Sequence, residues 1–137
     1  MALILDSSVL IAGERRRETV TQVIKRISAS LGDIESAISV VSITDLTHGI
    51  YRAKTDLDRL RRTAFVNELV LNLIVHPVSL DIATRAGRIE GELAANGISI
   101  DFPDLLIGAT ALHLGFDVAT SNTKHFKLIP GLNVITL

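Results

Sequence analysis

The stretch Ala-Leu-Ile-Leu-Asp-Ser-Ser-Val-Leu-Ile at positions 2–11 decides how this chain folds. Its aliphatic start is typical of a strand that is buried on both faces, as in a parallel sheet. Asp6 ends that run, and Ser7 and Ser8 are residue types that begin helices. In an open parallel sheet, ligands bind at the edge where strands end and helices begin. Asp6 is therefore the first candidate for a functional site.

The composition indicates one globular domain over residues 1–137. A chain of 137 residues suits a single core. Cysteine is absent, which excludes a disulfide framework and thiolate metal sites. The net charge of −1 gives no global basic field, so any contact with nucleic acid must come from a local patch.

No segment has the pattern of a signal peptide or a membrane span. The apolar N-terminus lacks preceding basic residues, and Asp6 interrupts it. No uninterrupted apolar run is long enough to cross a bilayer. We expect a soluble, cytoplasmic protein.

Strands and helices are expected to alternate along the chain. After the first strand, further strands are expected at 37–41, 74–78, 116–120 and 133–137. Helical segments are expected at 9–12, 19–31, 42–53, 56–73, 80–95 and 103–114. This order predicts a three-layer α/β/α sandwich around a central, mostly parallel sheet. Pro77 places its segment at a sheet edge.

Two helix boundaries in this prediction depend on single residues. Gly13 is expected to end the first helical turn, because glycine commonly stops helices. Ser42 and Asp45 have the spacing of a capping box, which would put Asp45 in the first turn of its helix.

Four polar side chains are expected at the strand-end edge of the sheet. Asp6 and Asn122 follow strands, whereas Asp45 and Asp104 lie near helix starts. Helices in this fold run antiparallel to the strands, so their N-termini face the same edge. A shared edge does not by itself bring the four within contact distance.

Each acid also has an ordinary structural role open to it. Asp6 could form a turn, and Asp101 could cap the last helix. Asp45 and Asp104 could be N3 residues whose negative charge is favoured by the helix dipole. Together, however, like charges about 5 Å apart at an effective dielectric of about 20 cost about 3 kcal/mol per pair. Such a set favours a cation, and its oxygen ligands suit Mg²⁺ or Mn²⁺ better than zinc.

The chain resembles the PIN-domain nucleases, in particular the VapC toxins of toxin–antitoxin pairs, in four ordered motifs. They are Leu-Asp-Ser-Ser-Val-Leu-Ile at 5–11, Ser-Ile-Thr-Asp-Leu-Thr-His-Gly-Ile at 42–50, Pro-Asp-Leu-Leu-Ile-Gly-Ala-Thr-Ala-Leu at 103–112 and Thr-Ser-Asn-Thr-Lys-His-Phe at 120–126. The resemblance covers nearly the whole length, including Ile-Pro-Gly-Leu at 129–132.

This resemblance implies a metal-dependent endoribonuclease with catalytic residues Asp6, Asp45, Asp104 and Asn122. Asp6 and Asp104 match the aspartates that hold Mg²⁺ or Mn²⁺ in the family. Asp45 is a third metal candidate at a position that is usually Glu, and its shorter side chain favours contact through water. Asn122 matches a fourth polar position that is often Asp. Fewer negative charges imply weaker metal affinity.

The resemblance also implies an RNA substrate, a cognate VapB-like antitoxin and a homodimer. Ser8, Arg15 and His125 are the candidates for contacts with RNA. Arg15 begins a basic run near the metal edge, although such a run is equally compatible with a solvated surface. The remaining histidines and a later basic cluster are expected to be ordinary surface or helix residues; they are His48, His76, His113, Arg59, Arg61 and Arg62.

Two alternatives to a ribonuclease toxin stay open from the sequence. One is a phosphotransferase that uses a strand-end aspartate as nucleophile. Such enzymes usually have a second acid two residues later, and Ser8 at that position counts against this alternative. The other is a PIN-like RNA-binding or RNA-processing domain with a partly degenerate site, which Asp45 and Asn122 keep open.

Overall fold

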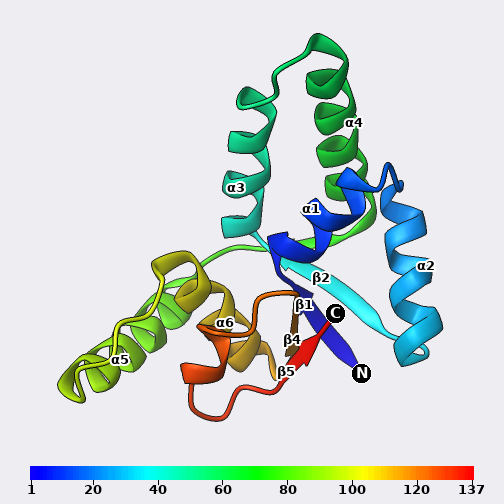
Figure 1. Cartoon of the computed structure of the whole chain (residues 1–137). Helices are drawn as coiled ribbons and strands as arrows, with labels where there is room; N and C mark the ends of the chain where they lie inside the picture. The colour runs from blue at the N-terminus through cyan, green and yellow to red at the C-terminus, as the bar shows by residue number, and fades with distance from the viewer.

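The computed structural model describes residues 1–137 and contains one five-stranded sheet. All of its paired strands run parallel, in the order β3-β2-β1-β4-β5 (Figure 1). The strands are β1 (Ala2–Leu5), β2 (Glu35–Ser39), β3 (Ile74–His76), β4 (Asp117–Thr120) and β5 (Val134–Thr136). The predicted parallel sheet is confirmed, and β3, which precedes Pro77, is an edge strand as expected.

Helices cover both faces of this sheet and complete the predicted three-layer α/β/α sandwich (Figure 1). They are α1 (Ser7–Arg15), α2 (Val20–Leu31), α3 (Val40–Tyr51), α4 (Asp56–Asn72), α5 (Leu80–Ala95) and α6 (Phe102–Leu114), with a short 3-10 helix η1 (Phe126–Leu128) before β5. None of these helices is both long enough and apolar enough to span a membrane.

The central strand β1 is buried on both faces, as its aliphatic run predicts. Leu3 and Leu5 pack into a core with residues of α1, α2 and α4. Ile4 points to the opposite core, where it joins Ile107 and other residues of α6 and β4. All three are completely buried, and each contributes about 1.5–3 kcal/mol by leaving water. This burial fixes the place where β1 ends, and therefore fixes Asp6.

The start of α3 differs from the prediction. Strand β2 ends at Ser39, and the Ser39 hydroxyl accepts a hydrogen bond from the Val41 amide at 3.1 Å, so Ser39 is the N-cap. Ser42, which the sequence offered as the cap, is instead buried inside the helix. The two valines resemble the end of a strand, but the cap that comes before them starts the helix earlier. Asp45 consequently lies in the second turn of α3 and not in its first.

The role of Gly13 also differs from the prediction. Helix α1 continues past Gly13 to Arg15 and ends just before Arg17, which has a positive φ of 61°. A Cβ added at Gly13 would lie 2.4 Å from Cγ2 of Val23 on α2. The missing side chain therefore permits the close approach of α1 and α2, and it does not stop the helix.

We expect Gly13→Ala to lower the free energy of unfolding by about 2 kcal/mol, because Val23 must move despite the better helix propensity of alanine. Gly91→Ala in α5 is the matched control, since nothing lies within 4 Å of its added Cβ. That variant should be more stable than the wild type by about 0.5–1 kcal/mol. Urea denaturation measures both values, and equal stabilisation by the two substitutions would contradict the packing role of Gly13.

Candidate metal and phosphate site

The candidate polar residues meet in an open cleft at the carboxyl edge of the sheet. Asp6 follows β1, Asn122 follows β4, Asp45 comes from α3 and Asp104 from α6. The cleft comprises two adjoining cavities of about 380 and 630 Å³, and Asp6, Asp45 and Asp104 line both of them. The first cavity is lined by Asp6, Ser7, Ser8, Ile11, Asp45, Asp101, Asp104, Asn122 and His125. The expected convergence at one edge is therefore observed.

Asp6 is the most buried acid of the cleft, with 5% of its surface exposed. Its Oδ2 accepts hydrogen bonds from Ser8 Oγ at 2.7 Å and from Thr120 Oγ1 at 2.9 Å. Oδ1 has no protein donor and is not enclosed. Asp6 occupies the N-cap position of α1 but makes no capping bond, so the turn role considered for it is not realised. One carboxylate oxygen remains open to a ligand.

Ser8 and Thr120 support Asp6 and each other. Their hydroxyl oxygens lie 3.1 Å apart, and Ser8 Oγ also accepts a bond from the Ser121 amide at 3.1 Å. The Ser8 hydroxyl is thus engaged by the protein, and its contact with RNA stays a prediction. Sequence reasoning missed Thr120, although its position at the end of a strand beside Asn122 was a usable signal.

Asp45 is oriented across the cleft by a neighbouring helix. Ser7 Oγ on α1 donates to Asp45 Oδ2 at 2.7 Å, while Asp45 itself is exposed. Ser7 was likewise missed as a supporting residue. Its bond restrains Asp45 on the side of the cleft that carries Asp6.

Asp104 is half-buried in the first turn of α6, as predicted. Its pKa is raised from 3.8 to about 6, chiefly because burial disfavours the charged form and then because Asp6, Asp101 and Asp45 are negative. His125 opposes that rise only in part. Asp101 stands at the N-cap position, but its side chain makes no capping bond, so only its predicted position is confirmed. The cleft is therefore short of positive charge.

His125 lines the cleft, and one of its ring nitrogens is hydrogen-bonded to the backbone. Its Nδ1 accepts a hydrogen bond from the Asp101 amide at 3.0 Å, so Nδ1 carries no proton and Nε2 carries one. A protonated Nε2 is a donor and not a metal ligand. Nearby, the backbone amide of Asn122 donates to Thr120 Oγ1 at 3.0 Å, and the Asn122 side chain has no protein partner. Both side chains are available to a ligand in the cleft.

The donor set fits a hard cation that retains several waters. No three acids or histidines converge tightly enough to hold one ion by themselves. Mg²⁺ is usually bound by one or two carboxylates together with waters, so a three-ligand cage is not needed. The open Oδ1 of Asp6 and the carboxyl group of Asp104 are suited to this mode, with Asp45 beside them.

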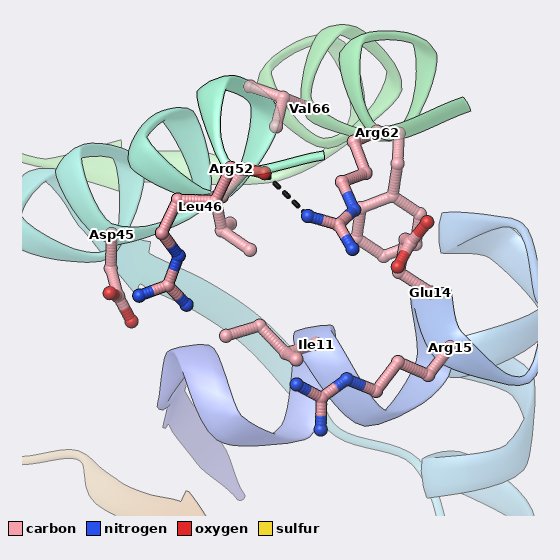
Figure 2. Close-up of a pocket in the computed structure, with 10 residues that line it drawn as sticks. Ile11, Glu14, Arg15, Asp45, Leu46, Arg52, Arg62 and Val66 are labelled. Atoms are coloured by element: carbon pink, nitrogen blue, oxygen red, sulfur yellow. Dashed lines mark hydrogen bonds between the residues drawn. The ribbon is translucent and has the colours of Figure 1, made fainter. Parts of the chain in front are cut away.

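A smaller pocket of about 190 Å³ adjoins the cleft between α1, α3 and α4 (Figure 2). Arg15 lines this pocket and not the acidic cleft, which refines its predicted place. Arg62 also lines it and is half-buried, which corrects the expectation that it is merely exposed. His48, another residue expected to be ordinary, lines the larger cavity of the cleft one turn after Asp45.

Comparison with known proteins identifies relatives along the whole chain. Residues 3–132 match the PIN domain family. "Ribonuclease VapC1" of Rickettsia felis is 31% identical over 137 residues, which cover 100% of this chain and 97% of that protein. "Ribonuclease VapC" of Rickettsia bellii is 33% identical with the same coverage.

Solved structures share the fold. The R. felis VapBC2 structure, bound to a promoter DNA fragment, matches with a TM-score of 0.84 at 20% identity over 100% of this chain and 99% of that chain. VapBC-5 of Mycobacterium tuberculosis matches with a TM-score of 0.77 at 27% identity, covering 99% and 98%. With a family match over almost its full length and full-length relatives above 30% identity, the chain belongs to the PIN domain family, among the VapC ribonucleases.

Proposed function

We propose that this protein is an Mg²⁺- or Mn²⁺-dependent endoribonuclease and the toxin of a type II toxin–antitoxin pair. The observation that carries the proposal is the meeting of Asp6, Asp45 and Asp104 in one cleft with no cation paired to them. Membership of the VapC ribonucleases supports RNA as the substrate. A divalent ion in this cleft would neutralise charge on the scissile phosphate and acidify water.

The protein's own side chains have separate tasks in this proposal. Asp6 and Asp104 would hold the ion, and Asp45, which Ser7 orients, would act on it through water. Asn122 offers its amide to a phosphate oxygen from the β4 side. His125 donates its Nε2 proton in a hydrogen bond to the phosphate, because Nδ1 is occupied by the Asp101 amide. These donors stabilise charge that grows on the phosphate as it is cut.

The proposed partners follow from charge and exposed apolar surface. An acidic cleft attracts Arg or Lys side chains, so a VapB-like antitoxin would inhibit by placing such a residue there. The matched VapBC2 and VapBC-5 structures support such a partner, because VapBC proteins form toxin–antitoxin systems. Large apolar side chains remain exposed near the α3–α4 turn, including Tyr51, Leu57 and Leu60. They support association, including a homodimer with two-fold symmetry.

We expect Asp104→Asn to reduce RNA cleavage about a thousandfold, because an anionic ligand is lost. Asp101→Asn, three residues earlier, should stay within about tenfold of the wild type, since Asn also occupies N-cap positions. Cleavage of a fluorescent RNA with Mn²⁺ measures both rates. Equal activities would show that Asp104 is not a ligand.

Asp104→Asn should also change how the stability of the protein depends on pH. The pKa of Asp104 is raised to about 6, so the folded state holds this proton more tightly than the unfolded state does. The resulting stability is present below the ordinary pKa of 3.8 and is lost as pH rises through about 6. In metal-free buffer, Asp104→Asn should therefore melt higher than the wild type above that range and gain nothing at acidic pH. An increase in melting temperature that is the same at every pH would contradict a raised pKa at Asp104.

Two substitutions separate the functions of the two His125 nitrogens. His125→Asn keeps an acceptor for the Asp101 amide but loses the distal donor, and should reduce kcat about a hundredfold. His125→Gln places an amide N–H near the Nε2 position and should stay within about tenfold of the wild type. Equal losses of kcat in the two variants would reject the donor role of Nε2.

A further inference from the structure

The pocket between α1, α3 and α4 is continuous with the acidic cleft but carries the opposite charge (Figure 2). Ile11 and Asp45 line both. Three guanidinium groups, those of Arg15, Arg52 and Arg62, line the pocket against the single further acid Glu14. A ligand that extends from the cleft on the Asp45 side therefore passes from acidic to basic surroundings.

Two of these guanidinium groups are free to bind a ligand. Arg15 on α1 and Arg52 at the end of α3 are exposed and have no carboxylate within ion-pair distance. Several other arginines are already paired: Arg16 and Arg26 with Glu18, Arg59 with Asp56, and Arg61 with Asp58. Figure 2 shows Arg52 extending along α3 toward Asp45, and Arg15 on the α1 side of the opening.

Arg62 lines the pocket, but its guanidinium group is hydrogen-bonded to the backbone of α3. Its Nη1 donates to the Gly49 carbonyl at 2.5 Å, near the C-terminus of α3. Carbonyl groups at a helix C-terminus carry partial negative charge, which would repel an anion. Arg62 offsets that charge and ties α4 to the end of α3 that presents Arg52. Arg62 is thus a positioning residue.

We propose that this pocket binds a phosphate of the RNA strand next to the phosphate that is cut, through Arg15 and Arg52. This inference rests on the proposed ribonuclease function. The guanidinium fork matches phosphate oxygens in two hydrogen bonds. The apolar side chains of Leu46, Phe65 and Val66 offer a surface for the attached nucleoside. An RNA strand meets both charge requirements, because its repeated phosphates can be held by an ion at Asp6 and by arginine beside it.

The test compares Arg15→Gln and Arg52→Gln with Arg85→Gln, whose arginine is exposed on α5 and lines none of these cavities. Steady-state cleavage of single-stranded RNA is measured with Mn²⁺ over a range of salt concentrations. Each pocket variant should raise KM about fivefold with kcat nearly unchanged. Each should also reduce the slope of log(kcat/KM) against log[salt] by about 0.7, and the double variant by about twice that.

Arg85→Gln should match the wild type. Arg52→Lys keeps the positive charge and should retain the wild-type salt slope. If the wild type cleaves RNA and the pocket variants behave like Arg85→Gln, the inference fails while the ribonuclease function stands. If those variants instead keep their RNA kinetics and only resist an antitoxin, the pocket belongs to that protein and the inference also fails. A wild type that cleaves no RNA with Mn²⁺ would overturn both.

Discussion

The carboxylate of Asp6 is held almost out of solvent by hydroxyl groups from Ser8 and Thr120 and by no cation. The aliphatic residues of β1 fix its position, because they are buried on both faces of the sheet. A fixed negative charge at this place contributes to raising the pKa of Asp104. The fold therefore holds acids that repel one another in one cleft. Such a loss of stability is typical of functional sites.

Much of the fold could be predicted because it depends on local patterns. The aliphatic run before Asp6 identifies a central parallel strand, and Ser79 starts α5 by accepting a bond from the Ile82 amide. Local signals fail where two of them compete. At the start of α3, the serine before two valines caps the helix, and the serine after them is buried. Gly13 does not end its helix, and glycine is needed there because Val23 of another helix packs closely against it.

The acids of the site could be predicted, but most of their support could not. Thr120 reaches Asp6 across 114 positions of sequence, and Ser7 reaches Asp45 across 38. Such pairs depend on strand order and on where α3 begins, which no local pattern supplies. The tautomer of His125 likewise follows from a backbone amide at Asp101 and not from its neighbours in sequence. The ordered motifs identify which residues matter, and the fold shows how each is held.

In the proposed function, the cleft and the pocket of Figure 2 would divide the binding of one polyanion between two kinds of charge. The acids can bind a phosphate only through a cation, whereas the arginines can bind one directly. His125 and Asn122 follow β4 and line the cleft but not the pocket. An RNA strand that ran from the pocket to His125 would pass the cleft acids, where the proposed function puts the scissile phosphate.

Metal binding at Asp6 is tested by the melting temperature of the protein with and without Mn²⁺, with Asp6→Asn measured beside the wild type. An ion that binds only the folded state at a hundred times its Kd stabilises it by about 2.7 kcal/mol. We expect Mn²⁺ to raise the wild-type melting temperature by several degrees and to have little effect on Asp6→Asn. A wild-type melting temperature unchanged by millimolar Mn²⁺ would contradict metal binding at Asp6.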